Sequence, residues 1–199
     1  CKRFIVIIDK VMLRICILVL ELFAAFAVTT ATASNNDIRT FLFDKGEVSI
    51  ISGPFRYAQE MDAVYLLELD PDRMLSGFRS EAGLSPRAPK YGGWESEGVA
   101  GQFLGHYLSA CAWYYSYTKD QRFKDRISYM VDELSECQKA NGNGYVAATP
   151  DGKRIFAEIA SGKVYSQGFD LNGGWVPLYV MHKVLAGLLD VYEKMGNAE

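Results

Sequence analysis

The sequence has few of the residues on which metal and nucleotide sites depend. Among its 199 residues there are two histidines and four cysteines, and no two cysteines form a Cys-x-x-Cys pattern. A zinc ribbon and a thioredoxin-like redox site are therefore not supported. The Gly-x4-Gly-Lys-Ser/Thr pattern of a P-loop is absent, so Gly152-Lys153 does not indicate a phosphate site. No histidine, cysteine and glutamate cluster has metal-site spacing, and no acidic pair stands out as an acid–base couple.

Positive charge is not in excess either. The chain has 21 Lys and Arg against 24 Asp and Glu, a formal net charge of −3. Nucleic acid is excluded as the main partner, because phosphate binding needs a clustered surplus of Lys and Arg. The composition, 49% hydrophobic and 23% charged, is typical of one globular domain with a packed core.

No apolar run approaches the roughly 20 residues that a comfortable bilayer span needs. The main apolar run, from Ile15 to Val28, follows Met12 and Arg14 and precedes the small residues 31–33. A cationic start, an apolar segment and an Ala-x-Ala site are typical of a secretory leader, and the alternative is a membrane anchor. We therefore predict a leader over 1–33 starting at Met12. We also predict a domain over 34–199 that is secreted, extracellular or periplasmic, with no stable membrane span after cleavage.

The two cysteines outside the predicted leader are not expected to form a disulfide. Cys111 and Cys137 fall on predicted helices on either side of a turn near Lys119-Asp120. In an antiparallel helix pair their positions differ by roughly 13 Å along the axis. A disulfide requires Cα atoms within roughly 7 Å, so we predict two free thiols.

Helical spacing of apolar residues dominates the rest of the chain. The predicted helices cover 54–69, 72–80, 96–117, 120–140 and 175–195. Residues 82–98 are predicted to be a loop, and 141–174 form a segment rich in Gly, Asn and Asp. Long successive helices with few strands indicate an all-α fold.

The predicted long helices are of two kinds. The helix over 120–140 has one apolar stripe and one charged face, so one side of it is expected to face water. The helices over 96–117 and 175–195 are apolar nearly all round, so both of their faces are expected to be covered. Inner helices that alternate with an outer, amphipathic helix are what an α/α barrel requires.

Each histidine lies on one of the two predicted helices that are apolar nearly all round, in a stripe beside the main apolar face. His106 shares its stripe with Gln102, Ser109 and Trp113, and the stripe of His182 consists of Trp175, Tyr179, His182 and Ala186. Aromatic faces that cover C–H surfaces, with a few polar groups for hydroxyls, are how proteins hold sugars. The alternative is that both are core histidines with internal partners.

Two loop clusters have both a functional and a structural interpretation. In Tyr91-Gly92-Gly93-Trp94-Glu95, the glycines would let a ligand approach the backbone and Trp94 would stack on it. Alternatively, Trp94 staples the loop and Glu95 favours a helix N-terminus. The segment 141–145, Asn-Gly-Asn-Gly-Tyr, has the residues typical of a turn, and a role of Tyr145 in a site is the alternative.

Several stretches together resemble glycoside hydrolase family 127, the β-L-arabinofuranosidase-like enzymes. They occur collinearly from about 46 to 193. The matching stretches are Gly53-Pro54-Phe55 with Ala58-Gln59, Tyr65-Leu66-Leu67 through Leu69-Asp70-Pro71-Asp72-Arg73 to Phe78-Arg79, Ala82-Gly83-Leu84, the cluster 91–95, 101–110 (GQFLGHYLSA), Gly144-Tyr145, Trp175-Val176-Pro177-Leu178-Tyr179, His182-Lys183 and 186–190 (AGLLD).

The resemblance implies an (α/α)6 barrel followed by β-rich domains. It implies retaining hydrolysis of non-reducing-end β-L-arabinofuranosides of plant-type glycans, with a zinc-bound cysteine as nucleophile and a glutamate as acid/base. The positions that carry over are those of a pocket for an arabinose-containing glycan: His106, Tyr179 and His182, with Trp94, Trp175 and Gln102. At Gln102 many relatives have a histidine, so one polar contact differs.

The resemblance covers only the N-terminal part of that barrel. The family's glutamate and zinc-binding cysteines lie further along a longer chain, and Cys111 and Cys137 do not match them. We therefore expect no catalytic residue and no zinc ligand within this chain. The first hypothesis is a partial barrel that is inactive, and poorly soluble or molten, when expressed alone. The alternative is a non-catalytic carbohydrate-binding or interaction protein. A third class, another α/α-barrel sugar enzyme such as an epimerase or lyase, fits the matching stretches less well.

Overall fold

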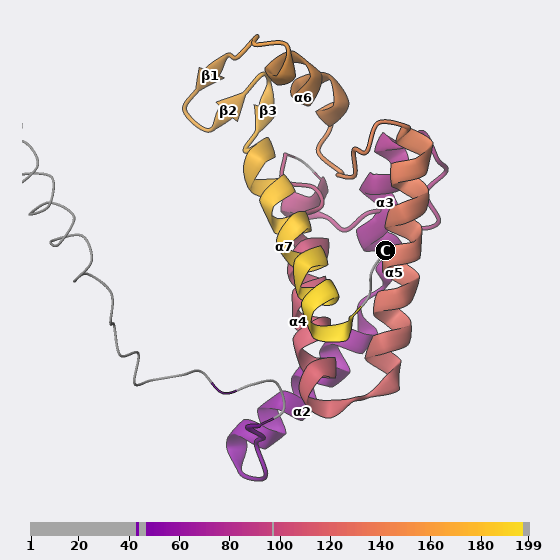
Figure 1. Cartoon of the computed structure of the whole chain (residues 1–199), viewed down its shortest axis with the longest axis vertical. Helices are drawn as coiled ribbons and strands as arrows, with labels where there is room; N and C mark the ends of the chain where they lie inside the picture. Colours follow the sequence, from indigo (N-terminus) through magenta and orange to yellow (C-terminus); the bar gives the residue numbers. More distant parts are fainter. Residues whose placement is uncertain (1–42, 44–46, 97, 197–199) are drawn as a thin grey trace, which may run out of the picture. The chain divides into compact units, whose positions relative to one another are not determined.

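The computed structural model describes residues 43, 47–96 and 98–196 of the chain. The predicted leader, with its start at Met12, lies outside these residues. The described part is all-α apart from one small sheet (Figure 1). Its α-helices are α2 (Pro54–Glu68), α3 (Pro71–Glu81), α4 (Gln102–Thr118), α5 (Gln121–Asn141), α6 (Gly152–Ala160) and α7 (Pro177–Met195). None of the helices in these residues is long and apolar enough to cross a bilayer.

The helix starts follow from local capping. Asp70 accepts a hydrogen bond from the Asp72 N–H at 2.9 Å, and Asp120 accepts one from the Arg122 N–H at 3.0 Å, so α3 and α5 begin within one residue of their predicted starts. The start predicted for α4, residue 96, is six residues too early. A short 3-10 turn, Gly93–Ser96, comes first, and Gly101 adopts a left-handed φ of 99° directly before Gln102.

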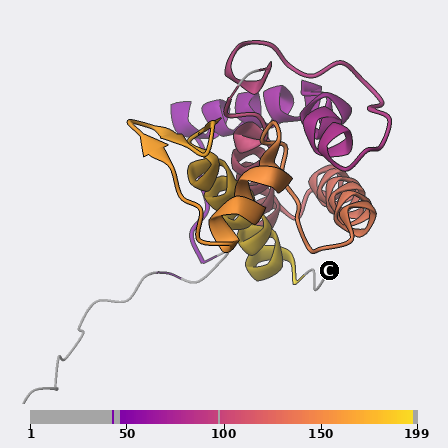
Figure 2. The same cartoon turned by 90° about the horizontal axis from the view of Figure 1, so that it is seen from above.

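Helices α4 and α7 lie side by side and run in the same direction (Figures 1 and 2). A methyl group built on Gly105 of α4 would lie 2.2 Å from the carbonyl oxygen of Lys183 on α7. Further along both helices, the Lys194 ammonium lies 4.1 Å from the centre of the Trp113 ring. Parallel neighbours of this kind are the inner helices of an α/α barrel.

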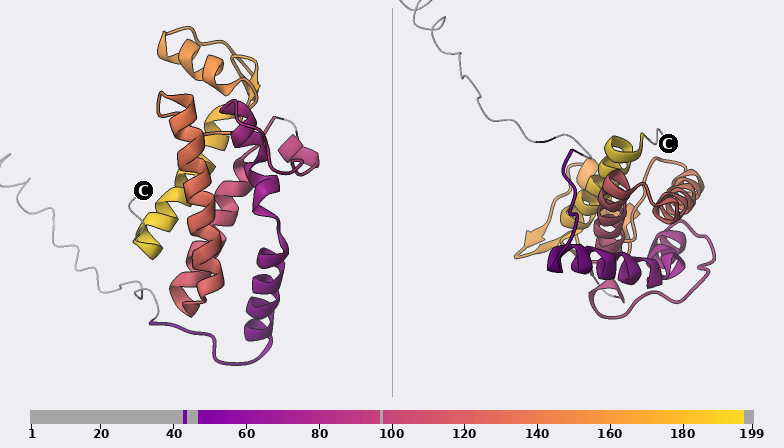
Figure 3. Two further views of the ribbon diagram at one scale, coloured as in Figure 1. Left: turned by 90° about the vertical axis from the view of Figure 1, so that its right-hand side faces the viewer. Right: turned by 90° about the horizontal axis from the view of Figure 1, so that it is seen from below.

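Helix α5 runs antiparallel to α4, to which it is joined by the short turn at Lys119-Asp120, and α2 and α3 follow each other beside it (Figure 3). The Arg126 guanidinium on α5 donates to the carbonyl oxygens of Leu67 and Leu69, where α2 ends. The core lies between these helices and one face of α7. Its fully buried members include Leu75, Phe78, Leu104, Leu108, Phe123, Ile127, Met130 and Val184. The described helices thus form part of an (α/α)6 barrel, as the sequence predicts.

The segment rich in Gly, Asn and Asp between α5 and α7 contains regular structure that was not predicted from the sequence. It contains α6 and a three-stranded antiparallel sheet, β1 (Ser166–Gln167), β2 (Asp170–Leu171) and β3 (Gly174–Trp175). Asn172 and Gly173 connect β2 to β3 with φ values of 53° and 83°, the left-handed conformations that a two-residue Asn-Gly hairpin requires. This small sheet leads the chain into α7.

Candidate functional site

A cleft of about 290 Å³ lies where the N-terminal ends of α4 and α7 meet the 3-10 turn and the small sheet. Its lining is largely aromatic and aliphatic, with one amide: Trp94, Val99, Gln102, Phe169, Trp175, Val176 and Tyr179. Four of the six predicted sugar-pocket residues, Trp94, Gln102, Trp175 and Tyr179, are therefore brought together from segments up to 85 residues apart. We call this feature the aromatic cleft.

The two tryptophans of the aromatic cleft contact each other edge to face. The ring centres of Trp94 and Trp175 are 6.2 Å apart, with an angle of 82° between the planes. Gly98 allows this arrangement, because a methyl group there would lie 2.8 Å from Cβ of Trp175. Both rings remain accessible, with Trp94 67% and Trp175 41% exposed, and can therefore cover the face of a ligand.

The loop that carries Trp94 is anchored to α4 through its neighbour Glu95. The two carboxylate oxygens of Glu95 accept hydrogen bonds from the N–H groups of Gly101 and Phe103, at 2.8 and 2.9 Å. A carboxylate at a helix N-terminus satisfies free N–H groups and interacts favourably with the helix dipole. Glu95 thus takes the capping role of the structural interpretation, and it fixes the loop that presents Trp94.

The other side of the aromatic cleft is held in a strained conformation. Val176 precedes Pro177 with a φ of 45°, a conformation that is unfavourable for a β-branched residue. Its N–H donates to the carbonyl oxygen of Phe169 at 3.0 Å, which joins the turn between β1 and β2 to the start of α7. Such strain persists only where the surrounding structure holds it, and it occurs often at ligand sites.

His106 and His182 lie one helical turn beyond the lining residues Gln102 and Tyr179, and both are exposed. They do not line the aromatic cleft itself. The interpretation of both residues as buried core histidines is wrong for this structure, since both are open to solvent. The Lys183 ammonium lies 5.0 Å from the centre of the Tyr179 ring.

The described residues do not fit the zinc that the family resemblance implies. No group of three or more His, Cys, Asp or Glu side chains in this part of the chain is placed to hold a metal. Cys111 and Cys137 are free, buried thiols. Burial raises the pKa of Cys111 to about 12 and that of Cys137 to about 11, so both stay protonated, whereas zinc takes the thiolate.

Tyr145, which stands in the 141–145 turn, lies outside the aromatic cleft. Its hydroxyl is buried against Gly152, where a methyl group would lie 1.9 Å from the oxygen. Burial raises the pKa of this phenol well above its usual range. Its surroundings indicate a packing role between α5 and α6.

Parallel inner helices with an antiparallel outer helix, and an aromatic cleft at the N-terminal ends of the inner pair, define a partial α/α barrel with one concave candidate site for a ligand. The family model described as "Beta-L-arabinofuranosidase, GH127 catalytic domain" matches residues 47–199. The chain belongs to this family. No curated protein matches it.

Three lining residues of the aromatic cleft were not predicted: Val99, Phe169 and Val176. Val176 stands inside a matching stretch, between Trp175 and Pro177. Phe169 is an isolated aromatic residue in a glycine-rich segment, and only the Asn172-Gly173 turn could have indicated that a hairpin carries it.

Proposed function

We propose that this chain supplies the sugar-binding part of a secreted β-L-arabinofuranosidase, which acts on non-reducing-end L-arabinofuranosides of plant-type glycans. The observation that carries the proposal is that Trp94, Gln102, Trp175 and Tyr179 line one cleft. Exposed rings suit the C–H faces of a sugar, and the amide with the two histidines one turn away suits its hydroxyls.

Binding without hydrolysis is what we expect of this chain by itself. The family's acid/base glutamate and its zinc-binding cysteines have no counterpart among the stretches that match here. The aromatic cleft needs neither group in order to hold a sugar.

The test is calorimetric titration of the full chain with methyl β-L-arabinofuranoside, with methyl β-D-glucopyranoside as the control sugar. We expect weak binding of the arabinoside, loss of that binding in Tyr179→Ala, and no release of arabinose from a nitrophenyl arabinofuranoside. Ser109→Ala, outside the aromatic cleft, is the matched control. Equal binding of both sugars, or binding of neither, would contradict the proposal.

The second candidate is a non-catalytic carbohydrate-binding protein, which the accessibility of the whole aromatic cleft within this one chain favours. The gene sequence downstream of the codon for Glu199 distinguishes the two candidate functions. A reading frame that continues downstream of Glu199 into segments with the family's glutamate and cysteines supports the enzyme, and a stop codon there supports the binding protein. Secretion is tested separately, by locating a reporter fused to residues 12–33.

A further inference from the structure

The aromatic cleft and the two histidines form a site whose two ends differ in chemistry. His106 lies four residues after Gln102 on α4, and His182 three residues after Tyr179 on α7. At about 1.5 Å of rise per residue, the histidines lie about 4.5–6 Å further along the helices than the lining residues Gln102 and Tyr179. Because α4 and α7 are parallel, both histidines are displaced in the same direction. The site therefore has an imidazole end and an aromatic end, about one sugar ring apart.

Phe169 extends the aromatic end beyond the tryptophans. It stands in the two-residue turn between β1 and β2, where Gln167 pairs with Asp170. Its side chain is 78% exposed, yet it lines the aromatic cleft. A phenylalanine that is mostly open to water adds little to the core. Together with the exposed rings of Trp94 and Trp175 it forms an apolar patch of the kind that marks a ligand-binding groove.

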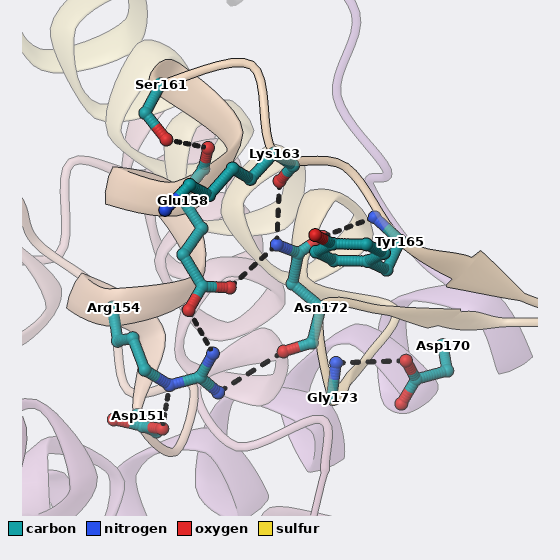
Figure 4. Close-up of polar contacts among 9 residues, drawn as sticks. All are labelled: Asp151, Arg154, Glu158, Ser161, Lys163, Tyr165, Asp170, Asn172 and Gly173. Carbon is teal, nitrogen blue, oxygen red and sulfur yellow. Dashed lines mark hydrogen bonds and ion pairs between the residues drawn. The ribbon is translucent and has the colours of Figure 1, made fainter.

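The hairpin that carries Phe169 is held by a network of hydrogen bonds around Asn172 (Figure 4). The Asn172 amide nitrogen donates to Glu158 on α6 at 2.8 Å and to the Lys163 carbonyl oxygen at 2.9 Å. Its amide oxygen accepts the N–H of Tyr165 at 3.0 Å. Arg154 of α6 donates to the Asn172 carbonyl oxygen at 3.2 Å. Asn172 is 6% exposed, so these bonds are shielded from water and the hairpin is tied to α6.

The turn is also tied directly to the helix that carries His182. Because the Phe169 carbonyl oxygen accepts the Val176 N–H, the residue at the rim is joined to the residue directly before α7. Phe169 is thus placed by backbone contacts on one side and by the Asn172 network on the other. A turn whose backbone is held in this way needs little ordering when a ligand binds.

We propose that Phe169, with Trp94 and Trp175, forms a subsite for a second sugar ring, the one to which the terminal arabinofuranosyl group is attached. The terminal group lies at the imidazole end, where its hydroxyls meet His106 and His182, and the second ring lies at the aromatic end, where it has C–H faces to cover. Phe169 is then a specificity-determining residue that favours disaccharides over simple glycosides. This inference rests on the proposed function.

The test compares two ligands and four proteins by calorimetry of the full chain. The ligands are methyl β-L-arabinofuranoside, with one ring, and an L-arabinofuranosyl-arabinose disaccharide. We expect the original chain to bind the disaccharide about tenfold more tightly, as stacking of one ring on an aromatic side chain allows. Phe169→Ala removes most of this difference and leaves the affinity for the methyl glycoside within about twofold. Tyr165→Ala, the matched control, removes a ring of similar exposure that does not line the aromatic cleft, and changes neither affinity.

Two results overturn the subsite while leaving the proposed function intact. Either Phe169→Ala weakens both ligands equally, or it weakens neither. If the original chain binds neither ligand, the proposed function fails and the subsite fails with it. Phe169→Tyr, which keeps an aromatic ring on the turn, is expected to retain the preference for the disaccharide.

Discussion

Gly105 of α4 and Gly187 of α7 lie directly against each other. A methyl group at Gly187 would be 2.4 Å from the Gly105 carbonyl oxygen, closer than any real contact. The two inner helices therefore approach as closely as they do because neither residue has a side chain. This approach sets the spacing between Gln102 and Tyr179, which line the aromatic cleft from the two helices.

We predict that Gly105→Ala destabilises the fold. The added methyl group meets backbone atoms of Lys183 and Val184, which cannot move without separating the helices. Overpacking of this kind costs about 3 kcal/mol. Denaturant unfolding followed by circular dichroism measures the loss, and Ala110→Ser, at an exposed position of α4, is the control, with a change of about 0.5 kcal/mol or less. An unchanged midpoint for Gly105→Ala would show that the helices do not pack as described.

The sequence predicts the long helices well because each has a period that packing preserves. Helix α5 has one buried stripe, and its ends differ from the predicted ones by a single residue. The periodicity of apolar residues does not predict where α4 begins. It depends on Glu95, six to eight residues away, whose carboxylate caps the N–H groups of Gly101 and Phe103.

The aromatic cleft is predictable only in part, because some of its residues are placed by contacts with residues outside their own local pattern. Gln102 and Tyr179 belong to helical stripes, and Trp94 and Trp175 belong to recognisable stretches, so periodicity and motif find them. Phe169 comes to the same cleft through a turn geometry and a network around Asn172 that no local period records.

Asn172 is expected to control the stability of the small sheet. Asn172→Gly keeps access to the φ of 53° and removes three side-chain hydrogen bonds, at a cost of about 2 kcal/mol. Asn172→Ala loses the same bonds and adds about 1 kcal/mol for the left-handed backbone. Hydrogen exchange of residues 163–176 checks this order: protection falls in the glycine variant and falls further in the alanine variant. Equal protection in all three proteins would mean that the network does not hold the hairpin.

The exposed apolar face of α7 is expected to limit solubility. Leu178, Leu185 and Leu189 are more than half exposed, while Val184 on the opposite face is fully buried. We predict that the double variant Leu185→Gln, Leu189→Gln binds less of a hydrophobic dye and gives more soluble protein, with an unchanged circular dichroism spectrum. Val184→Gln is the contrasting variant, because it puts an amide into the core and unfolds the chain. If the double variant is as insoluble as the original chain, the insolubility arises from a loosely packed core rather than from this face.

The two thiols are expected to make stability fall at alkaline pH. Burial raises the pKa of Cys137 to about 11 and of Cys111 to about 12, so the folded chain holds these protons more tightly than the unfolded chain, whose thiols ionise near pH 9. Their contribution to stability is fully present below about pH 9 and is lost as the pH rises through about 11–12. Cys111→Ser and Cys137→Ser, measured against the original chain from pH 7 to 11, should each flatten this decline. A thiol reagent at pH 8 should react only slowly with Cys111 and Cys137 in the folded chain, and should label both of these thiols once urea unfolds it. Fast labelling of either cysteine in the folded chain would contradict the burial on which the prediction depends.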